Sequence, residues 1–289
     1  MRSGEKRLRH YAEHFDTVEL NSTYYRLPEE DLVARWAERV PAGFVMHVKA
    51  FGMMTRHPVK ADVLPPELRE AVPVDERGRV DRPPRELRSE VFARFHSALE
   101  PLRAADKLGG ILLQFPSYIV CKPQSFEYLE WATNELRGDH ALVEFRHRSW
   151  LEEENRAKVF SFLEELGATY VIVDAPKTEA KNLVPTVFAR TSPTVYVRMH
   201  GRNEKTWNVR GRSAAERFDY LYSEEELREF LPAVREVAAD ADEAYVMFNN
   251  NGRSRAPGAS REGRDDWISQ APTNALMLQG ILQEEGSGS

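Results

Sequence analysis

The sequence has little cysteine, no long apolar run and no strong excess of charge of either sign. A single cysteine, Cys121, excludes an intramolecular disulfide framework and fits a reducing compartment. No apolar run approaches membrane-spanning length, and the first residues lack the apolar stretch of a signal peptide. The formal net charge of −6 argues against a dedicated nucleic-acid coat or a membrane-surface protein. We therefore predict a cytoplasmic globular protein with no membrane partner.

Strands and helices are predicted to alternate along the chain. Short segments rich in Val, Ile, Tyr and Phe are typical of buried strands, and amphipathic helical patterns fill the gaps between them. This alternation indicates parallel βα units. Because no G-x-G-x-x-G turn is present, we predict an α/β TIM-type barrel rather than a dinucleotide-binding sheet. The predicted strands are residues 17–21, 44–49, 110–115, 141–147, 169–174, 194–200 and 244–250.

One domain is expected over residues 1–285, because no linker divides the chain. Two long inserts, residues 58–88 and 201–222, each follow a predicted strand. Both are therefore expected at the C-terminal mouth of the barrel, where this fold places active sites. The first insert is rich in proline and charge and predicts a surface excursion or lid, whereas residues 286–289 read as a linker-like tail.

Every predicted strand ends in a polar or charged side chain, where a barrel interior ordinarily holds apolar ones. Strand side chains alternate between faces, so polar residues two apart share a face and are expected to point into the barrel. A single inward charge is more often a satisfied salt bridge, but seven strands ending this way favour one functional pocket at the mouth. The residues are Glu19, Asn21, Lys49, Gln114, Glu144, Arg146, Asp174, Arg198, His200, Asn249 and Asn250.

The charges of this predicted pocket balance. Three carboxylates, on Glu19, Glu144 and Asp174, face three cations, on Lys49, Arg146 and Arg198. A site for a hard divalent metal seldom gathers so many competing cations, which are better suited to a phosphate or a carboxylate. We therefore predict a site without a metal or other cofactor. A divalent metal held by these carboxylates with His47, His57 or His200 is the alternative.

Two loops after predicted strands are basic in this net acidic chain. The loop after residues 194–200 carries Arg202, Lys205, Arg210 and Arg212 around Trp207, and the loop after residues 244–250 carries Arg253, Arg255, Arg261 and Arg264. Barrel enzymes often bind phosphate with the loops that follow their last strands. Arginines beside an aromatic ring also suit a nucleic-acid backbone with a stacked base. A small phosphate-bearing substrate is thus the expected partner, and nucleic acid is an alternative one.

Eight ordered motifs resemble the domain-of-unknown-function 72 family, also called YecE-like. The resemblance begins near residue 7 and reaches the last helix, and it implies a TIM-barrel-like fold without fixing a reaction. The motifs are "FDTVELNSTYYRLP", "HVKA" with Thr55 beyond it, "LLQFP", "VEFRHRSW", "VIVDAP", "VRMHGR", "YLYSEEEL" and "FNN".

Two departures from the family pattern have structural consequences. The family usually opens with a strand containing Gly-Thr-Ser-Gly-Trp, whereas this chain begins in the helix that follows it. An open barrel with a gap between residues 17–21 and 244–250 is therefore expected. In addition, Arg56 separates Thr55 from His57, where the family tends to place His directly after Thr.

The leading hypothesis is an enzyme with hydrolase-type acid–base chemistry on an anionic, phosphate-bearing substrate. Glu144 or Glu19 is the predicted acid or base, and Asp174 and His200 orient or shuttle protons. The predicted substrate-binding residues are Asn21, Lys49, Gln114, Arg146, Arg198, Arg202, Trp207, Asn249 and Asn250.

Three alternatives to this hypothesis stay open. The first is a metal-dependent phosphodiesterase or endonuclease that uses Glu19, Glu144, Asp174 and His200. The second is a Schiff base on Lys49. The third, from another class of protein, is a non-catalytic binder of nucleic acid or a phosphorylated ligand.

Overall fold

The computed structural model describes residues 3–178, 180–207, 218–255 and 267–287. The chain falls into two compact units. Unit 1 comprises residues 1–146 and 165–168, and unit 2 comprises residues 147–164 and 169–289. The single domain over residues 1–285 and the gap between residues 17–21 and 244–250 stay predictions.

The core of unit 1 is a sheet of four parallel strands whose order follows the chain. Apolar side chains such as Met46, Val48 and Ile111 are fully buried in it, as expected for strands covered on both faces. The register pairs Gln114 with Glu144, so the carboxyl ends of two neighbouring strands lie side by side. The strands are β1 (Thr17–Leu20), β2 (Val45–Lys49), β3 (Leu108–Gln114) and β4 (Ala141–Glu144).

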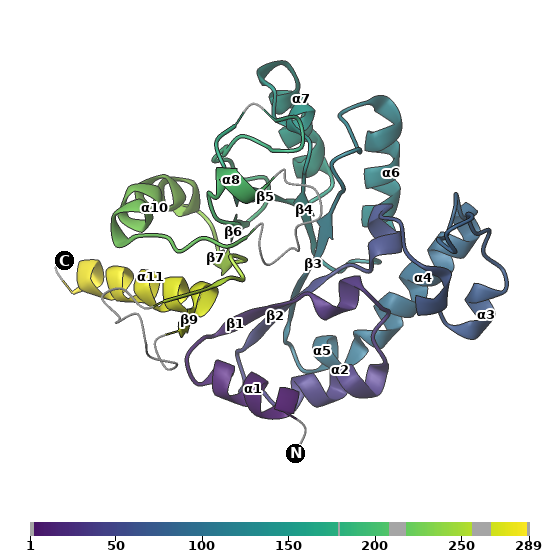
Figure 1. Ribbon diagram of the computed structural model, residues 1–289, viewed down its shortest axis with the longest axis horizontal. Helices are drawn as coiled ribbons and strands as arrows, with labels where there is room; N and C mark the ends of the chain where they lie inside the picture. Colours follow the sequence, from purple (N-terminus) through teal and green to yellow (C-terminus); the bar gives the residue numbers. More distant parts are fainter. Residues whose placement is uncertain (1–2, 179, 208–217, 256–266, 288–289) are drawn as a thin grey trace. The chain divides into compact units, whose positions relative to one another are not determined.

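Helices separate the strands of unit 1, and their apolar residues supply much of its core. Val91, Phe92 and Phe95 come together on one side of a helix because their spacing matches its turn, and all three are buried. Figure 1 shows α2 and α5 side by side beneath β1 and β2. The helices are α1 (Ser3–Ala12), α2 (Glu30–Ala37), α4 (Arg85–Ala98), α5 (Glu100–Ala104) and α6 (Pro123–Asn134).

The insert at residues 58–88 has short elements of its own. A hairpin holds it together through antiparallel bridges between Lys60 and Arg79 and between Val74 and Val80. The hairpin turns at Gly78, whose φ is +68°. Glycine adopts this backbone conformation without the steric clash that a Cβ atom would cause. Its action as a lid stays a prediction. The short elements in and before the insert are η2 (Gly52–Thr55), η3 (Ala61–Val63) and α3 (Pro66–Arg69).

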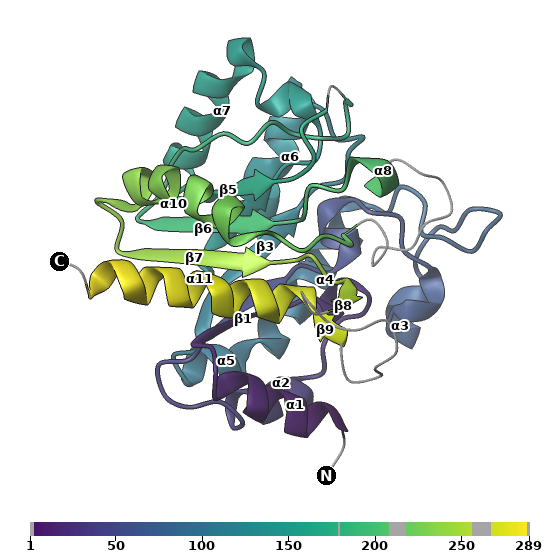
Figure 2. The ribbon, with the colours of Figure 1, turned by 60° about the vertical axis from the view of Figure 1, so that its left-hand side comes forward.

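Unit 2 contains three further parallel strands, again in chain order. All six residues of the first strand are buried, which matches its apolar sequence. Figure 2 shows β7 running beside β6, with α11 along its other side. The strands are β5 (Thr169–Asp174), β6 (Thr194–Met199) and β7 (Glu243–Phe248), and a separate antiparallel pair is formed by β8 (Arg253–Arg255) and β9 (Trp267–Ser269).

The helices of unit 2 include one with a well-defined start. Ser223 accepts a hydrogen bond from the backbone of Glu226, and the Glu226 side chain accepts one from the backbone of Ser223. This capping box fixes both the beginning of α10 and the position of the Glu226 carboxylate. The helices of unit 2 are α7 (Glu153–Glu165), α8 (Glu204–Trp207), α10 (Glu224–Ala238) and α11 (Gln270–Gly286), with η4 (Arg148–Trp150) before α7.

The predicted α/β class with the parallel βα units of a TIM-type barrel is confirmed, with seven parallel strands among the described residues. Strand 169–174 has the predicted bounds. Arg146, Asn249 and Asn250 lie just beyond strands predicted to contain them, because β4 ends at Glu144 and β7 at Phe248. Among the described residues, no helix is both long and apolar enough to cross a membrane.

Candidate functional site

Four polar side chains at or just beyond the carboxyl ends of β2, β3 and β4 meet in unit 1. Lys49 Nζ donates to Gln114 Oε1 at 3.0 Å, and Arg146 Nη2 donates to the same oxygen at 3.4 Å. Arg146 Nε also forms an ion pair with Glu144, whose side chain is fully buried. These four residues, Lys49, Gln114, Glu144 and Arg146, are the Lys49 cluster. It brings two cations to one amide oxygen.

Two rings border the Lys49 cluster. The Lys49 ammonium lies 4.6 Å from the ring centroid of Tyr24, and the Tyr24 ring meets His57 edge-on at 5.1 Å. Burial, together with the charges of Lys49 and Arg146, lowers the pKa of His57 to about 3, against an opposing effect of the Glu144 charge. The imidazole is therefore neutral at physiological pH.

The proton of His57 can be assigned from its neighbours. His57 Nδ1 lies 2.8 Å from Thr55 Oγ1, and that hydroxyl donates to the carbonyl oxygen of Gly52 at 3.3 Å. A hydroxyl has one proton, so Thr55 accepts a hydrogen bond from Nδ1–H of the ring. This assignment, made from the hydrogen-bond network, leaves Nε2 of His57 with a lone pair.

Glu19 and Asn21 share a face, as their spacing predicts. Asn21 Nδ2 donates to Glu19 Oε1 at 2.8 Å. Glu19 pairs with His47 in the register of β1 and β2, one residue before the end of β1. Burial lowers the pKa of His47 to about 4, against an opposing effect of the Glu19 charge. Glu19 is thus placed beside a buried histidine in the sheet.

Asp174, at the end of β5 in unit 2, accepts hydrogen bonds on its carboxylate from the side chains of Arg202 and Tyr222. Arg202 Nε donates to both carboxylate oxygens at 3.1 and 2.9 Å, and Tyr222 Oη donates at 2.6 Å. Tyr222 Oη also accepts from the backbone of Gly201, whose φ of +84° permits the turn after β6. Burial raises the pKa of the Tyr222 phenol, and the Asp174 charge raises it further. The carboxylate is therefore fully engaged by neutral and cationic donors.

Arg202 bridges two carboxylates. Besides binding Asp174, its Nη1 donates to Glu226 Oε1 at 3.1 Å, and Tyr220 Oη donates to the same oxygen at 2.6 Å. A cavity of about 470 Å³ lies beside Arg202 and Asp174 and is also lined by Lys177. The Arg202 charge is compensated inside unit 2, so the substrate-binding role predicted for it stays a prediction.

The other predicted residues of unit 2 are mostly buried. Arg198 and His200 are fully buried, and His200 Nδ1 accepts a hydrogen bond from Asn249 Nδ2 at 3.0 Å while its ring stacks on Phe218. Asn250 Nδ2 donates to the Tyr220 carbonyl and to Asn274 Oδ1, both at 2.8 Å. Asn250 thus ties the loop after β7 to α11. The side chain of Trp207 and residues Arg210, Arg212, Arg261 and Arg264 lie outside the described residues.

A known protein family matches nearly the whole chain. Residues 1–287 match the family described as "Protein of unknown function DUF72". The chain belongs to the DUF72 family. Among curated proteins, this DUF72 chain is 29% identical over 253 residues to the UPF0759 protein YunF of Bacillus subtilis, which covers 86% of this chain and 82% of that protein.

Solved DUF72 structures have the same fold. A DUF72 protein of Enterococcus faecalis superimposes with a TM-score of 0.74 at 25% identity and covers 97% of this chain and 95% of the other. A DUF72 protein of Thermotoga maritima has a TM-score of 0.71 at 31% identity, with 98% and 91% covered. The resemblance inferred from the eight motifs is confirmed.

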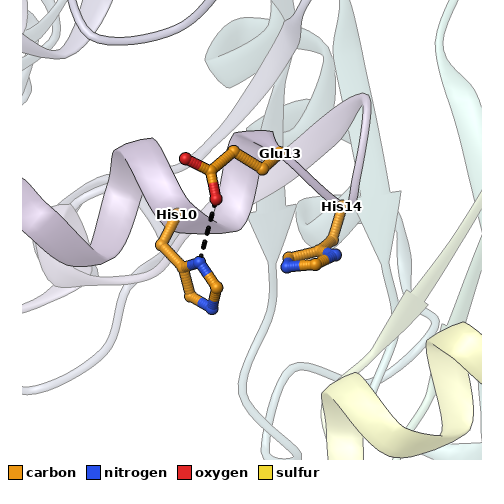
Figure 3. A group of neighbouring side chains, drawn as sticks. All are labelled: His10, Glu13 and His14. Atoms are coloured by element: carbon orange, nitrogen blue, oxygen red, sulfur yellow. Dashed lines mark hydrogen bonds and ion pairs between the residues drawn. The ribbon is translucent and has the colours of Figure 1, made fainter.

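A group of possible metal ligands lies at the end of α1. Within the described part of this DUF72 chain, the ligand atoms of His10, Glu13 and His14 lie within 4.8 Å of one another (Figure 3). His10 Nδ1 is 3.1 Å from Glu13 Oε2, and the two imidazole rings meet edge-on at 4.9 Å. All three side chains are exposed and none is a predicted site residue. The metal-dependent alternative stays a prediction.

Several residues that border the Lys49 cluster or bind Asp174 were not predicted from the sequence. Tyr24 and Tyr222 both lie in motifs quoted for the family, "NSTYY" and "YLYSEEEL", yet neither was singled out. Tyr24 and Tyr222 are both aromatic residues that lie outside the strands, and this shared feature could have pointed to them. His57 was considered only as a possible metal ligand, and it contacts Thr55 despite the intervening Arg56.

Buried neutral histidines predict acid sensitivity. The folded chain keeps His47 neutral down to a pKa of about 4, whereas the unfolded chain takes up a proton near its ordinary value of 6.5. Stability is therefore complete above pH ~6.5 and falls as the pH drops toward 4, by at most about 1.4 kcal/mol per pH unit for this histidine. Urea denaturation at pH 7, 6 and 5 measures the slope. His47→Gln should make it shallower by one proton, and an unchanged slope contradicts the assignment.

Proposed function

We propose that this DUF72 protein is an enzyme with hydrolase-type acid–base chemistry on an anionic, phosphate-bearing substrate, at the Lys49 cluster. The observation that supports this best is the meeting of Lys49 and Arg146 at Gln114 Oε1, beside a neutral imidazole. An ammonium and a guanidinium within reach of one oxygen position suit a phosphate group, which accepts several charge-assisted hydrogen bonds.

Glu144 acts in this proposal as a positioning residue. Its buried carboxylate holds Arg146 Nε, which orients the guanidinium toward Gln114. A carboxylate engaged in this way is poorly suited to exchange protons, since protonation would remove the charge that pairs with Arg146 Nε. The acid–base role predicted for Glu144, and those of Glu19, Asp174 and His200, stay predictions.

His57 is the proposed base. Burial and the cations beside it lower its pKa in the empty site, and an anionic substrate that neutralises those cations would raise that pKa. Proton acceptance at Nε2 would thus be strongest when substrate is bound. A water molecule gives its proton to Nε2 as its oxygen bonds to phosphorus, and the Lys49 ammonium donates a proton to the departing ester oxygen.

The proposal is tested with purified protein and chromogenic phosphomonoesters and phosphodiesters, with and without EDTA. Lys49→Met should lower kcat/KM by about 100-fold or more, because a transition-state contact is lost. The matched control is Lys60→Met, an exposed lysine of the same unit, which should retain the parent rate. Phosphate-ester binding without turnover would instead favour the non-catalytic phospho-ligand binder. Activity lost with EDTA and restored by a metal would favour the metal-dependent alternative.

A further inference from the structure

A cavity of unit 1 lies between the 58–88 insert and the loop that follows β3. Its volume is about 510 Å³. His57 lines this cavity and also borders the Lys49 cluster. We refer to it as the insert cavity.

The lining of the insert cavity is strongly basic. Five cationic side chains face two carboxylates, those of Asp75 and Asp81. Asp75 pairs with Arg79 at 2.8 Å, and Asp81 lies 3.9 Å from Arg82. For the remaining three cations, no carboxylate of the described residues lies within ion-pair distance. They are Arg56, Arg88 and Lys122.

Two of these three cations make cation–π contacts with the same aromatic ring. The guanidinium carbons of Arg56 and Arg88 lie 4.9 and 5.4 Å from the ring centroid of Tyr128, whose hydroxyl donates to the Met54 carbonyl at 2.8 Å. Tyr118 Oη donates to the backbone carbonyl of Arg56 at 2.5 Å. The two guanidinium groups are therefore positioned before any ligand arrives, at the cost of repulsion between like charges.

The insert cavity also leaves hydrogen-bonding capacity unused. Among the described residues, the buried Nε of Arg88 has no hydrogen-bond partner. Arg56 adopts a φ of +64°, a strained conformation for a residue with a side chain. Ser125, in the first turn of α6, lines the same cavity, so the positive end of that helix adds to the field. An anion in the cavity would accept a hydrogen bond from Arg88 Nε and would be attracted by the positive end of α6.

We infer that the insert cavity binds a dianionic phosphate group of a small molecule, through Arg56, Arg88 and Lys122. This inference rests on the proposed function, since His57 joins the cavity to the Lys49 cluster and the group would be a second anionic group of the same substrate. Three uncompensated cations match a phosphomonoester, which carries nearly two charges, better than a nucleic-acid phosphodiester, which carries one.

The test is calorimetric titration of the full chain with inorganic phosphate at low salt. The parent protein should bind two phosphates, one in the insert cavity and one at the Lys49 cluster. Arg88→Met and Lys122→Met should each weaken binding in the cavity by about tenfold, because a charge-assisted hydrogen bond is lost. Lys49→Met should retain that cavity site. The matched control is Arg77→Met on the exposed tip of the insert, which should bind like the parent.

The outcomes separate the two proposals. One phosphate in the parent, lost in Arg88→Met, supports the insert cavity and contradicts phosphate binding at the Lys49 cluster. Phosphate binding that neither Arg88→Met nor Lys122→Met changes overturns the inference and leaves the Lys49 cluster intact. Tighter binding of a short single-stranded oligonucleotide, with the same dependence on Arg88, also overturns it. Lys122 is exposed, so its variant reports on binding even if Arg88→Met folds poorly.

Discussion

Arg202→Met should lower the free energy of unfolding by about 3–5 kcal/mol, far more than a surface change. The Asp174 side chain is 1% exposed and receives two hydrogen bonds from Arg202 Nε. Removing the guanidinium leaves a buried carboxylate whose remaining side-chain donor, among the described residues, is the hydroxyl of Tyr222. Urea denaturation at neutral pH measures the loss.

A matched control for this variant exists in the same unit. Arg228 contacts Glu224 and Glu284, but its side chain is 37% exposed. Arg228→Met should therefore destabilise the protein far less than Arg202→Met. If Arg202→Met is no less stable than Arg228→Met, then Asp174 is hydrated in solution and the buried network is contradicted. Asp174→Asn combined with Arg202→Met should recover part of the loss, because the buried Asp174 charge is removed.

Arg146→Met should have an effect of similar size in unit 1, again about 3–5 kcal/mol. Glu144 is fully buried and forms an ion pair with Arg146. The control is Arg94→Met, since Arg94 also binds two carboxylates but both are largely exposed, so its loss should cost about 1 kcal/mol or less.

The double variant Glu144→Gln with Arg146→Met discriminates between two readings of this pair. If the cost of Arg146→Met comes from the stranded Glu144 charge, the double variant should be more stable than Arg146→Met alone. If both variants are equally destabilised, the cost comes from lost packing of the Arg146 stem instead. Chemical denaturation of all four proteins in the cycle gives the coupling energy.

The strands were predictable because their signal is local. Residues 169–174 carry an unbroken β-branched and aromatic run, and the observed strand has those bounds. The paired placement of Glu19 with Asn21 followed from alternation and is seen as a hydrogen bond. Where a strand ends was less predictable, because the end of β4 at Glu144 depends on backbone pairing rather than composition.

The partners of the charged residues were not predictable in this way. Arg202 was assigned to substrate as part of a basic loop, yet it binds Asp174, 28 positions earlier in the chain. Tyr222 lies 48 positions from the same carboxylate. A count of charges along a loop does not show which are compensated, since compensation depends on contacts made by distant segments. For the same reason, the insert cavity had no signal in the sequence.

Gly109 has a consequence for how this protein would respond to systematic mutagenesis. A Cβ at this position would lie 2.3 Å from the Val45 side chain and 2.6 Å from the His47 ring. Its backbone conformation is ordinary, so intolerance there would reflect lack of space alone. In a tolerance map of every position, Gly109 would score as severely as Lys49 or Arg146 while taking no part in chemistry. Mutational depletion scores alone would therefore place Gly109, a residue of the packed sheet, among the active-site residues.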